Sequence, residues 1–139
     1  MFVKFEDIEV WQMARELVRE IYQLTSVGAF AKDWGLKDQI QRATVSIGSN
    51  IAEGHGRRGN KEMVKFLWIA KGSASEVQSQ LYSACDLGYL TKEQFDILYT
   101  KVNAIQAKIY RLIQSFSADP DRQKLQPSPL TFSPLTPNP

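Results

Sequence analysis

The most chemically suggestive stretch of the sequence is "EGHGRRGNKE", residues 53–62. It places three glycines among one histidine and several cations, a composition that also occurs in phosphate-binding loops. The cations are Arg57, Arg58 and Lys61, and Lys65 follows four residues later on the same side of the expected helix. Three interpretations are open: a phosphate-binding site, an active site, or only a corner between two helices.

Known nucleotide-binding loops and catalytic motifs do not fit this stretch. Residues 54–59 satisfy G-x-G-x-x-G, but both that fingerprint and the Walker loop follow a strand, and here a helical pattern precedes. His55 is the only histidine and Cys85 the only cysteine. Di-iron bundles need Glu-x-x-His pairs, zinc sites need several Cys or His ligands, and a nucleophile needs an adjacent base. We therefore expect no enzyme, no metal site and no cofactor.

Positive charge is unevenly distributed along the chain, although the net charge is only +2. Residues 31–71 carry eight basic and four acidic side chains, whereas residues 72–100 carry one basic and four acidic. Residues 101–117 carry three basic side chains and no acidic one. This clustering is compatible with a solvated surface or with an anionic partner. A second group of cations that could bind such a partner consists of Lys101, Lys108 and Arg111.

Targeting features are missing from the sequence. No apolar run approaches the roughly 20 residues that cross a bilayer. The opening "MFVKFEDIEVW" has no apolar signal core, and a lone Cys85 cannot form an internal disulfide. We expect a cytoplasmic protein with no membrane partner.

Helices must position these residues, because apolar side chains recur every three or four residues along most of the chain. The pattern predicts four helices and an all-α fold. The last helix has the most regular pattern, with apolar residues from Phe95 to Phe116 stepping by three and four without interruption. The predicted helices span residues 7–25, 36–53, 61–87 and 91–117.

Capping residues predict where these helices begin and end. Thr91 opens a capping box, and Gly88 before it favours the end of the third helix. At the corner, Gly54 or Gly56 is the expected C-cap of the second helix, and Asn60 the expected N-cap of the third.

The end of the chain differs in composition from the rest. All six prolines lie after residue 119, and the segment there has no hydrophobic period. We predict a bundle domain over residues 1–117 and a disordered, flexible proline-rich tail over residues 118–139.

Several apolar residues fall outside the main stripes. Such surplus apolar surface often marks contacts between subunits. The alternative is that the stripes are wider than the pattern indicates. These residues are Val45, Ile69, Tyr82, Ile97, Tyr110 and Ile113.

The stretch "QIQRATVSIGSNIAEGHGRRGNKEMVKFLWIAKGSASEVQSQL" resembles the proteins encoded within bacterial 23S ribosomal RNA intervening sequences, the S23 family. The accessory variability protein of diversity-generating retroelements is a relative of that family. The resemblance covers about residues 5–116. It implies an antiparallel up-down four-helix bundle without catalytic activity, which assembles into a homopentamer with a basic surface. In the retroelement branch it also implies a reverse transcriptase and nucleic acid as partners.

The resemblance also singles out polar residues on the second and third helices. Those on the second helix step by four, four and three, so they share one face. We interpret them as a structural polar network between helices or subunits rather than as a ligand site. They are Arg42, Ser46, Asn50 and Glu53, facing Ser73 and Glu76.

The expected function is that of a nucleic-acid-binding accessory protein with RNA as its partner. Arg57, Arg58, Lys61 and Lys65 would contact phosphates, and repetition of this group around an oligomer would strengthen binding. Base-specific readout is not expected, because no RRM or KH signature is present. The alternative is a scaffold that binds a partner enzyme, such as a reverse transcriptase, without touching nucleic acid.

Overall fold

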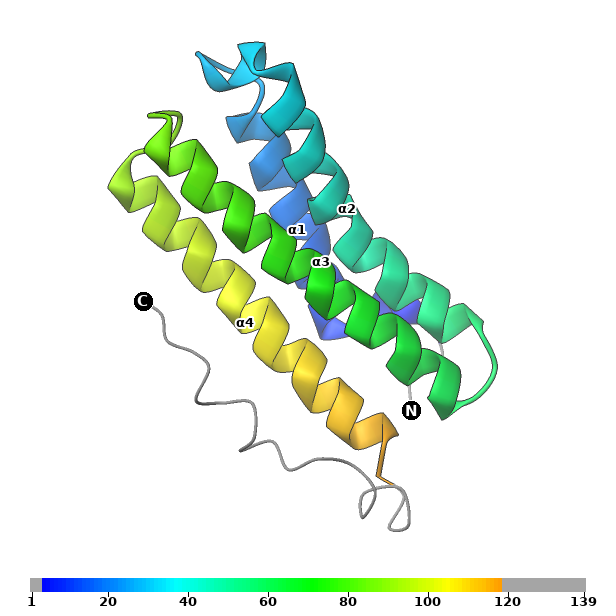
Figure 1. Ribbon diagram of the computed structural model, residues 1–139. Helices are drawn as coiled ribbons and strands as arrows, with labels where there is room; N and C mark the ends of the chain where they lie inside the picture. Colours follow the sequence, from blue (N-terminus) through cyan, green and yellow to red (C-terminus); the bar gives the residue numbers. More distant parts are fainter. Residues whose placement is uncertain (1–3, 119–139) are drawn as a thin grey trace.

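The computed structural model describes residues 4–118, and these form an all-α bundle of four long helices (Figure 1). The helices run alternately up and down, so each is antiparallel to the next, as expected. The predicted tail, apart from Ala118, lies outside the described residues. The helices are α1 (Glu9–Leu24), α2 (Trp34–Gly56), α3 (Asn60–Asp86) and α4 (Lys92–Phe116), with short 3-10 turns η1 (Phe5–Asp7) and η2 (Phe30–Lys32).

The core lies between the four helices and follows the predicted periodicity. On α4 the residues from Phe95 to Ile109 that step by three and four are buried. Ile113, which the stripe left out, is also buried, because a 3.6-residue repeat shifts the inward face slowly along a long helix. The remaining surplus residues behave differently: Val45, Ile69, Tyr82 and Ile97 are exposed, and Tyr110 is half-buried.

The starts of α2 and α4 form where local side chains satisfy free backbone groups. The Thr91 hydroxyl accepts from the Gln94 amide at 3.0 Å, and the Gln94 side chain accepts from the Thr91 amide at 2.9 Å, which confirms the capping box. Gly88 has a φ of 80° and follows the end of α3, as predicted. Asp33 caps α2 by accepting from the Leu36 amide at 3.1 Å, so α2 begins at Trp34, two residues earlier than expected.

The corner between α2 and α3 differs from the prediction. Gly54 lies inside α2, which continues to Gly56, and α3 begins at Asn60 after Gly59 with a φ of 89°. The predicted glycine C-caps and the Asn60 N-cap are therefore wrong. Gly54 is needed for helix packing, because a Cβ there would lie 2.9 Å from the Cβ of Phe66.

Figure 1 shows that the α2–α3 corner, the start of α1 and the end of α4 all lie at one end of the bundle. The two remaining connections, from α1 to α2 and from α3 to α4, lie at the opposite end. The antiparallel arrangement thus brings together charged segments that are far apart in the sequence.

Candidate nucleic-acid interface

Arg57 directly follows α2 and is held by neighbouring acidic groups. Its Nε and Nη2 donate to Glu53 Oε2 at 3.0 Å and 2.9 Å. Glu62 lies 3.9 Å from the guanidinium on another side, and the same guanidinium lies 5.1 Å from the centroid of the Phe66 ring. A phosphate would have to compete with these two carboxylates, so Arg57 is a weaker phosphate ligand than the sequence suggests.

Arg58, Lys61 and Lys65 keep their charge at the surface. All three are exposed, and none forms an ion pair with another described residue. The ammonium of Lys65 lies 5.6 Å from the centroid of the Phe66 ring, an uncharged partner that leaves the positive charge of the lysine unneutralised. These three cations are available to an anionic partner.

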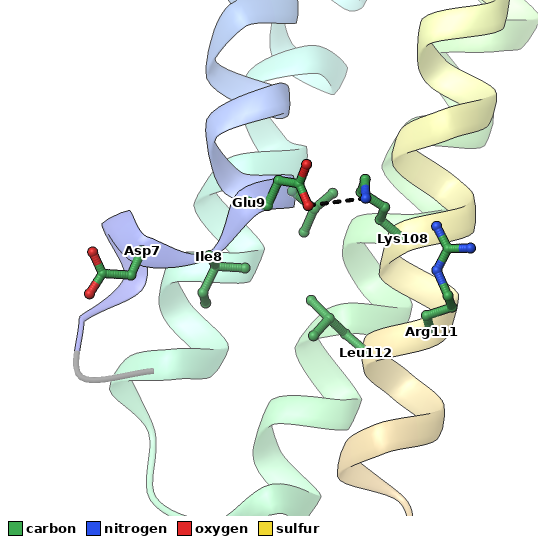
Figure 2. Close-up of a pocket in the computed structure, with 7 residues that line it drawn as sticks. Asp7, Ile8, Glu9, Lys108, Arg111 and Leu112 are labelled. Carbon is green, nitrogen blue, oxygen red and sulfur yellow. Dashed lines mark ion pairs between the residues drawn. The ribbon is translucent and has the colours of Figure 1, made fainter. Parts of the chain in front are cut away.

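The second group of cations is mostly paired. Lys101 forms an ion pair with Glu20, and Lys108 forms one with Glu9 at 3.0 Å. Figure 2 shows Glu9 and Lys108 pointing toward one another across a hollow of about 300 Å³ between the start of α1 and the end of α4. Two of the three candidates therefore connect α1 to α4, and only Arg111 has no ion pair within the described part of the chain.

Charge is polarised along the bundle. The half that contains the α2–α3 corner comprises residues 4–15, 46–72 and 104–118, and we call it the basic end. It carries nine basic and five acidic side chains, whereas the other half of the described chain carries six basic and eight acidic. The basic end is therefore the half to which a polyanion would be attracted.

A small polar network joins α2 to α3 above the corner. The hydroxyls of Ser46 and Ser73 lie 2.8 Å apart, and Asn50 Nδ2 donates to Ser46 Oγ at 2.9 Å. Asn50 also donates to the Ser46 carbonyl at 2.8 Å. The structure thus brings together three of the six residues that the sequence assigned to one network.

Arg42, Glu53 and Glu76 do not join that network within the chain, so the prediction of a contact between helices is wrong for them. Their part in a contact between subunits stays a prediction. Arg42 pairs with Asp38 one turn away on α2, at 2.9 Å, and Glu53 pairs with Arg57. Both Arg42 and Glu53 therefore pair with an exposed residue of opposite charge four positions away along the chain, rather than with a residue on another helix. Glu76 lies at the surface and lines a hollow of about 260 Å³ with Gln39, Arg42, Ala43, Ser46 and Gln80.

Sequence reasoning did not single out Trp68. Its side chain is 50% exposed on the outer side of α3, and its ring meets that of Tyr110 on α4 edge to face, with centroids 6.2 Å apart. In the sequence pattern, Tyr110 is one of the surplus apolar residues. The sequence does carry one signal for this surface: Lys61, Trp68 and Lys71 are spaced so that they lie along one side of a helix.

Residues 4–118 contain neither a cluster of metal-ligating side chains nor a candidate membrane span. No group of three or more His, Cys, Asp or Glu side chains there could hold a metal ion. None of the helices is both long enough and apolar enough to span a bilayer.

Comparisons with known proteins agree on one family. A family model described as 23S rRNA-intervening sequence protein matches residues 6–111. Among solved structures, a protein of unknown function from the S23 ribosomal protein family of Bacteroides thetaiotaomicron is similar, with 24% sequence identity and a TM-score of 0.71. The similarity covers 76% of this chain and 95% of that chain, and it supports the fold. A comparison with curated proteins gave no match.

Proposed function

Because the chain belongs to the family of 23S rRNA-intervening sequence proteins, we propose that it is a non-enzymatic accessory protein that binds nucleic acid, with RNA as its partner. The observation that carries this proposal is the surplus of positive charge at the basic end. The exposed, unpaired cations Arg58, Lys61 and Lys65 lie together there, beside the partly neutralised Arg57. Such a surface suits a phosphate backbone.

The proposed binding is electrostatic and independent of sequence. Each phosphate that a cation neutralises releases counterions, so affinity falls steeply with salt. Flexible lysine and arginine side chains at a helix end carry no fixed pattern of donors for base edges. The protein would therefore hold RNA by its backbone.

A charge-removal experiment tests this proposal. Binding of a fluorescent RNA to the full chain is measured by anisotropy at several salt concentrations. The test variant changes Arg57, Arg58, Lys61 and Lys65 to Gln. The matched control makes the same change in net charge at the opposite half, by converting Arg19, Lys32, Lys37 and Lys92 to Gln.

We expect the test variant to lose most of its affinity and to show a flatter salt dependence, by about one unit of slope for each lost contact. The control variant should bind like the unmodified chain. Equal affinity and equal slope in a folded test variant, or an equal loss in both variants, would refute the assignment to this end.

A second candidate function is a scaffold for a partner protein. Large apolar side chains are exposed at the end opposite to the basic one, with Trp34 75%, Val27 62% and Leu87 58% exposed. A reverse transcriptase is the partner that the S23 resemblance implies, through that family's relative, the accessory variability protein of retroelements. Binding of RNA by the isolated protein with unchanged affinity after Trp34→Ala would favour the first function.

A further inference from the structure

Trp68 lies among cations on the side of α3 next to α4. Lys71 follows it by three residues and Lys61 precedes it by seven, so the three side chains share one side of the helix. The Lys71 carbonyl accepts from Gln106 of α4 at 3.5 Å, which places this side of α3 at the boundary between the two helices. We call Lys61, Trp68, Lys71 and Tyr110 the aromatic patch.

No carboxylate opposes these cations. Between residues 60 and 75 the only acidic side chain is Glu62, and it lies toward Arg57 on the α2 side of α3. The facing part of α4, residues 104–116, has no acidic side chain. Lys61 and Lys71 form no ion pair with any described residue, so positive charge beside the indole is not balanced locally.

The other aromatic cluster on the same two helices provides a contrast. Tyr82, Phe95 and Tyr99 contact one another at the opposite end of the bundle, with centroids 4.8 to 5.6 Å apart. There the nearby Lys92 is paired with Asp96 at 2.7 Å. Trp34 is also exposed and has Lys37 4.9 Å from its ring centroid, but it lies outside the basic end. The aromatic patch combines an exposed indole with the half of the bundle that carries the surplus of positive charge.

We propose that the aromatic patch binds single-stranded RNA, with an unpaired base stacked on Trp68 and the flanking phosphates held by Lys61 and Lys71. This inference rests on the proposed function and specifies its ligand. Stacking on an exposed indole requires an unpaired base, whereas phosphate contacts alone would accept a duplex equally well. The edge contact with Tyr110 limits the rotation of the indole and leaves half of the side chain free.

A second copy of this chain suits the patch less well. In a two-fold contact the same patch would face itself and bring the four lysines of two subunits together without a carboxylate. Like charges in such a place oppose association. A polyanion removes this repulsion, so the charge of the patch favours RNA over a two-fold self-contact. The contacts of a closed ring are head-to-tail, and there this inference requires the patch to stay outside them.

The test compares an unstructured RNA of about 12 nucleotides, a length within the usual range of single-strand site sizes, with a duplex of the same length. Binding to the full chain is measured by fluorescence anisotropy for the unmodified protein, Trp68→Ala and Trp68→Phe. Trp34→Ala is the matched control, because Trp34 is a more exposed indole outside the basic end. Circular dichroism and light scattering check the fold and the oligomeric state of each variant.

We expect Trp68→Ala to weaken single-strand binding about tenfold or more and to leave duplex binding nearly unchanged. Trp68→Phe should retain part of the affinity, and Trp34→Ala all of it. In a Trp11→Phe, Trp34→Phe background, single-stranded RNA should quench the remaining indole emission. This measurement tests the contact even if Trp68→Ala does not fold.

Other outcomes overturn different parts of the argument. Unchanged single-strand affinity in Trp68→Ala, an unquenched Trp68, or a preference for the duplex would refute stacking while leaving RNA binding by the basic end intact. A reduced oligomer mass in Trp68→Ala would identify the patch as a subunit contact and also refute it. No RNA binding by the unmodified chain would refute the proposed function itself, and this inference with it.

Discussion

At the scale of single residues, the partner of each cation decides what it can do. Arg57 and Arg58 are adjacent in sequence, yet Arg57 is held by Glu53 at 2.9 Å and Arg58 has no ion pair with any described residue. Exposed ion pairs contribute little to stability, but they do compete with an incoming phosphate. We therefore assign most of the proposed phosphate binding to Arg58, Lys61 and Lys65.

Gly54 is the residue whose replacement the structure forbids most clearly. A Cβ at this position would lie 2.9 Å from the Cβ of Phe66, so Gly54→Ala should lower the free energy of unfolding by about 1–3 kcal/mol through overpacking. Gly56→Ala is the control, because a Cβ there meets nothing within 4 Å and replaces a flexible helical residue. Urea denaturation of both variants checks the prediction. Equal stability of the two would show that α2 and α3 adjust easily at this point.

At the scale of elements, Asp33 fixes the start of α2 and ties it to the α3–α4 connection. Its carboxylate accepts from the Leu36 amide at 3.1 Å and from the Tyr89 hydroxyl at 2.8 Å. Tyr89 in turn stacks on the buried Phe30 of η2, with centroids 5.0 Å apart. At the end of the bundle opposite the corner, one carboxylate thus links the start of α2 to the connection between α3 and α4.

This arrangement makes part of the stability depend on pH. The hydrogen bond from the Leu36 amide, and then that from Tyr89, hold the pKa of Asp33 below its ordinary value. A lowered pKa means that the carboxylate contributes stability above the unfolded-state pKa of about 4, and that this contribution is lost as pH falls through the folded-state pKa. Asp33→Ala should therefore lower the Tm by a few degrees at neutral pH, and the difference should shrink in acid.

Thermal unfolding of both proteins between neutral pH and pH 2 measures this difference. Asp33→Asn serves as the control, since an amide oxygen can still cap the helix but does not titrate in this range. A gap between Asp33→Ala and the unmodified chain that stays constant with pH would show that the carboxylate charge plays no part.

At the scale of the whole molecule, the polarised charge and the exposed apolar residues indicate how copies of the chain could assemble. Val45, Ile69, Tyr82 and Ile97 lie on three helices and are 39%, 43%, 47% and 51% exposed. Apolar surface spread around a bundle in this way suits contacts with more than one neighbour. We propose a homopentamer, the state that the family resemblance implies, in which side-by-side bundles would gather their basic ends into a ring.

Light scattering tests this proposal directly. At micromolar concentration we expect a mass five times that of the 15.8 kDa chain. Ile69→Lys or Ile97→Lys should lower that mass, because burying an unpaired charge at a subunit contact is unfavourable. Arg58→Gln, at the exposed corner, is the control and should leave it unchanged. A stable monomer would remove the ring of charge from the account of RNA binding.

The sequence alone determined which segments are helical and where several of them begin and end. Periodicity, the Thr91 capping box and Gly88 act over a few residues, so they can be recognised without knowing what packs against them. The corner was less predictable. Gly54 has the local properties of a helix stop, yet it lies inside α2, where the close approach of Phe66 of α3 leaves no room for a side chain.

Only the tertiary structure decided which cations are available and which aromatic side chains accompany them. Glu20 and Lys101 are 81 residues apart, and the distance between Glu9 and Lys108 is set by how α1 packs beside α4. Likewise, the meeting of Trp68 with Tyr110 depends on the relative rotation of two helices. Packing fixes that rotation, because each helix turns until its apolar face is buried. Which side chains then meet on the outer surface follows from this packing, and no short stretch of sequence encodes it.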